Sequence, residues 1–246
     1  MLTPGFKILE RVIMKHNVYA IILAAGKGHR MGGPILKQYM NLVDRPVLAH
    51  TIASFDAAPS IDALILVTSS LDQEFIKEKI LNNYPVKKPV FFVVGGSERQ
   101  ESVWNAINSI EGGEIVAVHD GVRPLISIKV IEKTIIAAKQ FGAAAAGMPV
   151  KDTIKEIDNR GFAIHTPDRS KLWLIQTPQT FQLPLLMEAH IKAREDFYLG
   201  TDDCSLVERL GHPVKLIEGH YSNIKITTWS DIDIAMQLLN NRGDQF

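Results

Sequence analysis

Apolar runs alternate along this chain with segments of helical periodicity, and the alternation restricts the possible folds more than any other feature. Strands that alternate with helices are typical of βαβ units and a mainly parallel sheet. We expect strands at residues 19–23, 63–68, 90–94, 115–119 and 143–149. We expect helices at residues 46–55, 71–81, 101–110, 128–141 and 203–210. The order predicts an α/β fold with a Rossmann-like, mainly parallel sheet flanked by helices.

The alternation changes character between residues 150 and 177. Two short stretches of alternating polarity, 153–157 and 161–165, flank the turn sequence Asp-Asn-Arg-Gly, which predicts a protruding β-hairpin arm. The βα pattern returns at 214–217 and 229–239. We therefore expect one domain over residues 18–246, with a β-arm at about 150–177 and an N-terminal extension over residues 1–17.

Charge and cysteine content limit the possible partners and compartment. The chain has 27 Lys and Arg residues and 27 Asp and Glu residues, so it has no excess charge for nonspecific binding to nucleic acid or to a membrane surface. The apolar run 18–25 is far shorter than the roughly 20 residues that span a bilayer. The single cysteine, Cys204, fits a reducing compartment. We expect a cytoplasmic protein that binds neither nucleic acid nor membrane.

A glycine-rich segment, LAAGKGHRMGG at residues 23–33, follows the first predicted strand. Small residues at such a turn let backbone amides approach phosphates, and the candidate nucleotide contacts are Ala24, Ala25, Gly26 and Gly28. The spacing matches neither the dinucleotide fingerprint nor the P-loop. Arg30 and Lys37 follow closely and could stabilise the charge of a triphosphate. The alternative is a plain turn with solvated basic residues.

A second candidate site is HDGVRP at residues 119–124, where an apolar strand ends in a carboxylate. Ligands of parallel α/β sheets bind at this end of the strands. Asp120 could bind nucleotide through Mg²⁺, as a hard oxygen ligand, and Arg123 could hold a substrate phosphate. A helix-capping or turn aspartate is the alternative.

Two more segments place polar groups at strand ends. In GGSERQES, residues 95–102, Gly96 and Ser102 could approach a base or ribose, although Ser102 also suits the first turn of a helix. Near the C-terminus, Lys225 lies between Ile224 and Ile226. On a strand it would point opposite to both, either into a site or, as an edge lysine, into solvent.

These motifs, in this order, resemble the 2-C-methyl-D-erythritol 4-phosphate cytidylyltransferase family over about residues 18–239. The family patterns AAGxGxRMG, PKQ, GDER and HDAARP correspond to residues 24–32, 36–38, 96–99 and 119–124. PVKDT at 149–153, DR at 168–169, LW at 172–173 and QTPQ at 176–179 follow the family order. This chain departs from the patterns at Leu36, Ser97, Gly121 and Val122.

The resemblance implies transfer of CMP from CTP to 2-C-methyl-D-erythritol 4-phosphate, giving CDP-methylerythritol and pyrophosphate, with Mg²⁺ as cofactor. It assigns the catalytic charges to Arg30, Lys37 and Lys225. It also implies a homodimer in which the arms are swapped, so that Thr153 and Arg169 hold the phosphorylated polyol in the partner's site, and it adds Thr177 to the substrate-binding residues.

Two other functions are compatible with the motifs. A ribitol 5-phosphate cytidylyltransferase shares the loop, the strand-end aspartate and the TPQ segment, but the arm residues 168–169 and 172–173 are more similar to the methylerythritol group. A non-catalytic nucleotide-binding regulator could keep the same fold. The charges of Arg30, Lys37, Asp120 and Lys225 favour catalysis, because a pure binder has less need of them.

Overall fold

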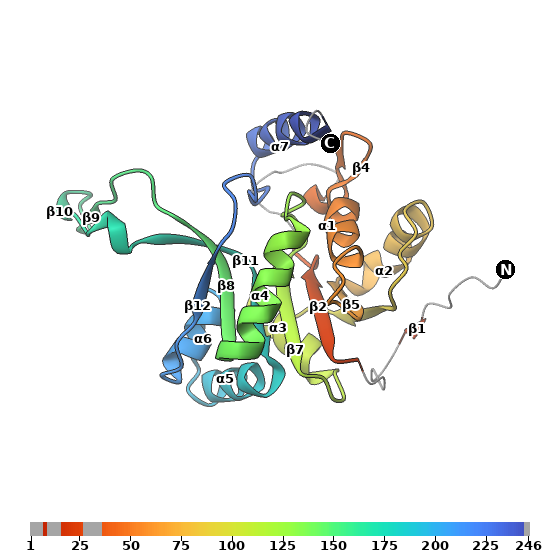
Figure 1. Cartoon of the computed structure of the whole chain (residues 1–246), viewed down its shortest axis with the longest axis horizontal. Coiled ribbons are helices and arrows are strands. Elements are labelled where there is room, and N and C mark those ends of the chain that lie inside the picture. The colour runs from red at the N-terminus through yellow and green to blue at the C-terminus, as the bar shows by residue number, and fades with distance from the viewer. Residues whose placement is uncertain (1–6, 9–15, 27–35, 244–246) are drawn as a thin grey trace.

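The computed structural model describes residues 7–8, 16–26 and 36–243 (Figure 1). Its centre is an eight-stranded sheet in the order β1-β6-β5-β2-β7-β11-β8-β12. The strands are β1 (Lys7–Ile8), β2 (Val18–Leu23), β5 (Ala63–Thr68), β6 (Val90–Val94), β7 (Ile115–Asp120), β8 (Ala143–Pro149), β11 (Trp173–Gln182) and β12 (Lys215–Glu218). The five strands predicted first are confirmed, and β7 extends one residue further than expected, to Asp120.

The strand β11 is the exception to the parallel arrangement. It pairs antiparallel with both β7 and β8, whereas the remaining neighbours in the sheet pair parallel. The sequence did not predict this strand, because Pro178 interrupts it and a proline cannot donate to a sheet ladder. Its pairing with β8 shifts register between Ile175 and Gln179, around that proline.

Helices cover both faces of the sheet. They are α1 (Val47–Asp56), α2 (Gln73–Phe75), α3 (Arg99–Asn108), α4 (Ile128–Phe141), α5 (Leu183–Glu195), α6 (Asp203–Arg209) and α7 (Trp229–Gly243). The 3-10 turn η2 (Ser70–Asp72) precedes α2, and the π-helical segment η3 (Ile76–Leu81) follows it, so the helix predicted at 71–81 is helical throughout. The helix α5 was not predicted, although its buried residues Leu186, Ala189, His190 and Ala193 recur at helical spacing.

Alternate residues of each strand point to opposite faces and build two separate cores. In β2, Ala20 and Ile22 pack with α1, η3 and α4, whereas Tyr19 and Ile21 pack with α3, α5 and α6. A third apolar cluster joins α7 to Leu42, Val122 and Ile226. The last helix therefore lies over the loops at one end of the sheet rather than on either face (Figure 1).

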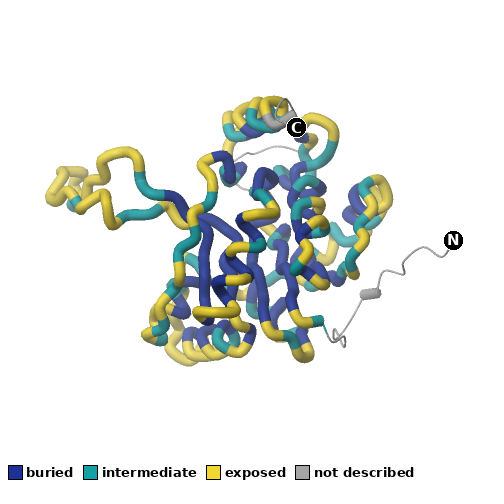
Figure 2. The backbone as a smooth tube through the Cα atoms, in the orientation of Figure 1, coloured by how far each residue is buried: buried dark blue, intermediate teal, exposed yellow. Residues whose placement is uncertain are grey.

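The predicted arm is present. Its two-stranded sheet joins β9 (Glu156–Ile157) and β10 (Ala163–His165), and the 3-10 turn η4 (Arg169–Lys171) follows. The arm projects from the body, and almost all of its residues are exposed (Figures 1 and 2). Because β11 begins at Trp173 and pairs with β8, residues 173–177 of the predicted arm form part of the main sheet.

The N-terminal extension also contacts the sheet, since β1 pairs with β6 at its edge. A short hairpin of β3 (Asn41–Leu42) and β4 (Arg45–Pro46) follows the 3-10 turn η1 (Lys37–Tyr39) and leads into α1. Within the described residues, no helix is long and apolar enough to cross a membrane.

Candidate active site

The candidate site lies where β2 and β7 end side by side. The two strands run parallel, with Leu23 opposite Asp120 in the register. The backbone N–H of Gly121 donates to the carbonyl oxygen of Leu23 over 2.9 Å, and a Cβ on Gly121 would lie 2.8 Å from that oxygen. This contact brings the described start of the glycine-rich segment, residues 24–26, next to Asp120.

Asp120 is the centre of a group of charges. Its Oδ2 atom lies 3.0 Å from Lys225 Nζ and 3.4 Å from Arg123 Nε, and its Oδ1 atom lies 3.7 Å from Arg99 Nε. The carboxylate is buried, with 9% of its side chain exposed. We call these four residues the Asp120 cluster.

The cluster keeps Asp120 ionised. Burial by itself would raise the pKa of its carboxyl, but the charges of Lys225, Arg99 and Arg123 outweigh burial and hold the pKa well below its usual range. Burial lowers the pKa of the Arg123 guanidinium, and Asp120 partly offsets that effect. A compact anion is therefore surrounded by cations that could also neutralise phosphate oxygens.

His119 and Thr177 fix the position of the Asp120 backbone. The Thr177 Oγ1 atom accepts from the Asp120 backbone N–H at 3.1 Å and lies 3.0 Å from His119 Nδ1. The other ring nitrogen, Nε2, lies 3.2 Å from the Arg123 carbonyl oxygen. A carbonyl can only accept, so Nε2 carries the proton, and Nδ1 accepts from the Thr177 hydroxyl. Burial lowers the pKa of His119 to about 4 and keeps the ring neutral.

Asn223 fixes the segment that carries Lys225. Its side-chain amide donates to Gln176 Oε1 at 3.1 Å and to the Thr177 carbonyl oxygen at 2.9 Å. Arg123 Nη1 donates to the Asn223 carbonyl oxygen at 2.8 Å. These contacts join the C-terminal segment to β11 and to the loop after β7, and they place Lys225 beside Asp120.

The described start of the glycine-rich segment, residues 24–26, is held by a side chain further along the chain. Gln38 is buried, and its Nε2 donates to the carbonyl oxygens of Ala24 and Gly26 at 3.0 and 3.1 Å. Lys37 precedes it in η1, so these two neighbours provide a positive charge and a structural anchor. The predicted contacts Gly28 and Arg30 lie outside the described residues.

The loop after β6 completes this edge of the site. The Ser102 hydroxyl accepts from the Gly96 N–H at 3.0 Å, so it helps to fix the conformation of this loop. A Cβ on Gly95 would lie 2.5 Å from the Cβ of Ala25. The loop and the glycine-rich segment can therefore pack together only because residue 95 has no side chain.

The structure does not bring every predicted residue together. Thr153 and Arg169 are exposed on the arm, and in the described structure neither contacts the Asp120 cluster; Arg169 Nη1 donates to the Lys151 carbonyl oxygen instead. Thr177 is buried beneath Asp120 and makes its contacts to protein groups. Sequence reasoning missed Arg99, His119 and Asn223 as contributors to the site.

A magnesium ion could be held at Asp120 together with substrate. The described residues contain no group of three or more His, Cys, Asp or Glu side chains that could hold a metal alone. One ionised carboxylate fits the way Mg²⁺ binds in nucleotide sites, where substrate phosphates and water supply the other ligands. The donor set thus suits a metal that arrives with the nucleotide.

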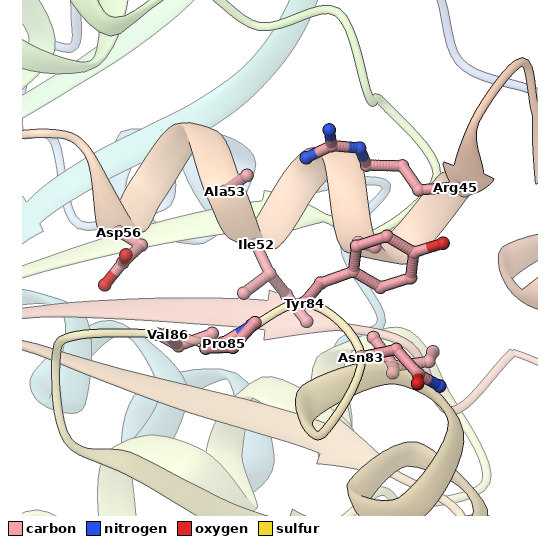
Figure 3. A pocket seen from close by; sticks show the side chains of 10 residues that line it. Arg45, Ile52, Ala53, Asp56, Asn83, Tyr84, Pro85 and Val86 are labelled. Atoms are coloured by element: carbon pink, nitrogen blue, oxygen red, sulfur yellow. The ribbon is translucent and has the colours of Figure 1, made fainter.

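A separate surface pocket of about 260 Å³ lies between α1 and residues 83–86, with Arg45, Asp56 and Tyr84 at its wall (Figure 3). None of the residues that line it belongs to the Asp120 cluster. The charges, and not this pocket, therefore define the candidate active site.

The fold and the site define the class: an α/β protein that gathers cations around a carboxylate at the carboxyl edge of a parallel sheet, where nucleotides bind. The family model described as 2-C-methyl-D-erythritol 4-phosphate cytidylyltransferase matches residues 18–241. The chain belongs to this family.

Curated relatives and solved structures agree with the family model. A 2-C-methyl-D-erythritol 4-phosphate cytidylyltransferase of Desulforamulus reducens is 46% identical, over 92% of this chain and 97% of the relative. The enzyme of the same name from Caldanaerobacter subterraneus is 48% identical, over 89% and 97%. A crystal structure of 4-diphosphocytidyl-2C-methyl-D-erythritol synthase from Anaerococcus prevotii superposes with a TM-score of 0.82 at 34% identity, over 91% of this chain and 96% of that one.

The neutral state of His119 makes stability depend on pH. The unfolded chain takes up a proton on this ring below pH 6.5, but the folded protein does so only near pH 4, so stability present above pH 6.5 is lost as the pH falls toward 4. Between pH 7 and 4 we expect the wild type to lose about 3 kcal/mol more free energy of unfolding than His119→Gln, measured by urea denaturation.

The exposed His165 provides the control, because His165→Gln should follow the wild-type pH dependence. Parallel curves for the wild type and His119→Gln would contradict the burial of a neutral imidazole at this site.

Proposed function

We propose that this protein transfers CMP from CTP to 2-C-methyl-D-erythritol 4-phosphate, releasing pyrophosphate. Family membership over residues 18–241 gives the substrates, and the Asp120 cluster is the observation that supports catalysis. The acceptor's phosphate would attack the α-phosphorus of CTP, so an O–P bond forms as the bond to pyrophosphate breaks. No covalent bond to the protein is needed.

Positioning and charge neutralisation would provide most of the catalysis. Ala24, Ala25, Gly26 and Gly96 would contact the nucleotide through backbone groups at the ends of β2 and β6, and Arg30 and Lys37 would neutralise its phosphates. A magnesium ion held by Asp120 and the triphosphate would withdraw charge from the phosphate oxygens. Arg123 would hold substrate phosphate beside the carboxylate.

Lys225 would change partners when substrate binds. In the described structure its ammonium group lies 3.0 Å from Asp120 Oδ2 and is neutralised there. A phosphate entering beside the cluster offers a second anion, and a metal at Asp120 would weaken the first pairing. The lysine would thus be available near the α-phosphate when charge develops on it.

We also propose that the protein acts as a homodimer with exchanged arms. The arm is exposed, and Thr153 and Arg169 lie away from the cluster of their own chain, which supports a role in a second copy's site. Exposed apolar side chains along the arm, Ile154, Ile157, Phe162 and Ile164, also favour burial against a partner.

The buried thiol of Cys204, the chain's single cysteine, supports a cytoplasmic location.

The experiment that tests this function is pyrophosphate release from CTP and Mg²⁺ with 2-C-methyl-D-erythritol 4-phosphate, beside D-ribitol 5-phosphate and beside ATP, GTP and UTP. We expect turnover with CTP and the methylerythritol acceptor alone. Preference for ribitol phosphate would contradict the acceptor assignment but keep the chemistry. The absence of pyrophosphate release with both acceptors would favour the nucleotide-binding regulator.

Replacing the arm arginine should affect one substrate only. Losing a charge-assisted contact to phosphate costs roughly 1.5–3 kcal/mol, so we expect Arg169→Ala to raise KM for the acceptor by about 10- to 100-fold and to leave KM for CTP almost unchanged. Steady-state kinetics with each substrate varied in turn measures both constants.

Arg160 is the matched control, because it lies at the arm's turn with 79% of its side chain exposed and pairs with Asp158. Arg160→Ala should have wild-type constants. An equal rise in both KM values for Arg169→Ala would rule out a contact confined to the acceptor.

A further inference from the structure

A second buried carboxylate lies behind the Asp120 cluster. Asp203, the first residue of α6, is 1% exposed, and its Oδ2 atom lies 2.7 Å from Arg99 Nη1. Burial opposes ionisation of Asp203, but the charge of Arg99 and the contact with His190 outweigh burial and lower the pKa of its carboxyl. The two residues are therefore an ion pair inside the protein, formed across 104 positions of sequence.

Arg99 joins this carboxylate to the active site. Its guanidinium contacts Asp203 through Nη1 and lies 3.7 Å from Asp120 Oδ1 through Nε. Lys225 and Arg123 both lie against the other oxygen, Oδ2. The two carboxylate oxygens of Asp120 thus have different partners, and Arg99 connects Oδ1 to a second buried carboxylate.

Asp203 itself is attached to β11. Gln179 accepts from the Asp203 backbone N–H through Oε1 at 3.0 Å and donates from Nε2 to Asp202 Oδ2 at 2.7 Å. Two residues earlier, Thr177 accepts from the backbone of Asp120. One strand therefore positions both Asp120 and the carboxylate that holds its arginine.

We propose that Arg99, anchored by Asp203, is a positioning residue of the nucleotide site, which holds Oδ1 of Asp120 so that Oδ2 is presented to Lys225, Arg123 and a nucleotide-bound metal. The inference deepens the proposed function and rests on it. Its effect is on binding of the metal–nucleotide pair and not on the acceptor, which the arm would hold.

The geometry favours this role over a purely structural ion pair. The Nη2 atom of Arg99 is buried and has no hydrogen-bond partner in the described structure, so the guanidinium keeps unused donors at the site. An ion pair retained for stability alone would be expected to have hydrogen-bond partners for all its buried donors. Apolar residues in place of a buried ion pair often give the same stability.

Calorimetric titration of the full chain with CTP and Mg²⁺, without acceptor, tests the role directly. Asp203→Asn removes the anchor's charge and keeps its shape, and we expect the Kd for CTP with Mg²⁺ to rise about tenfold, while KM for the acceptor stays at the wild-type value. Partial unfolding of the variant would instead lower the active fraction and kcat, and it would leave the Kd for CTP and the KM for the acceptor unchanged. The melting temperature of the variant shows whether such unfolding occurs.

Arg99→Lys provides a second test if Asp203→Asn does not fold. A lysine keeps a charge beside Asp203 but cannot reach both carboxylates, so we expect the same rise in Kd. In the Arg99→Lys background, Asp203→Asn should add little further effect, because both changes remove one connection. Fully additive effects would contradict a role through Arg99.

Asp196→Asn is the matched control, because it removes another carboxylate paired with an arginine, Arg209 at the end of α6, at 2.8 Å. It should bind CTP as the wild type does. If Asp203→Asn and Arg99→Lys also have the wild-type Kd, the inference is wrong, and that result is independent of whether the wild type turns CTP over.

Discussion

An ionised carboxylate inside a protein must be balanced by nearby positive charge, and the rest of this structure depends on how Asp120 meets that condition. Lys225, Arg123 and Arg99 come from three different elements and converge on its two oxygens. Their convergence requires β7 to end beside β2, and it requires the C-terminal segment to return across the sheet edge. The cations that stabilise the buried Asp120 carboxylate in the folded protein are thus also placed where they could neutralise a triphosphate.

The antiparallel strand β11 holds the Asp120 cluster in place through side-chain hydrogen bonds. Thr177 and Gln179, two residues apart, contact the backbone of Asp120 and of Asp203. Gln176, next to Thr177, accepts from the Asn223 amide that orients the lysine segment. A short stretch of polar residues in one strand therefore connects the two carboxylates and the C-terminal segment, and polar residues are buried there because each has a partner.

Much of the fold could be predicted because strong local patterns agree with it. Buried parallel strands such as β5 are continuous apolar runs, and α4 has clear helical periodicity between Ser127 and Gly142. The sequence could not predict β11, whose buried polar residues and Pro178 hide its strand character. Asp120 and Arg123 were proposed from the end of a predicted strand, and Lys225 from a strand pattern at residues 224–226 where the structure forms no strand. The Arg99–Asp203 pair depends on tertiary contacts that no local pattern encodes.

We propose that Asp120 couples the nucleotide to a metal and restrains the surrounding cations, and the most direct measurement is CTP binding to wild type and Asp120→Asn, with and without Mg²⁺. We predict that Mg²⁺ tightens binding to the wild type. In the variant that dependence should be lost, while binding without Mg²⁺ should improve, because the cations no longer face a carboxylate. A variant that keeps the full Mg²⁺ dependence would contradict the claim.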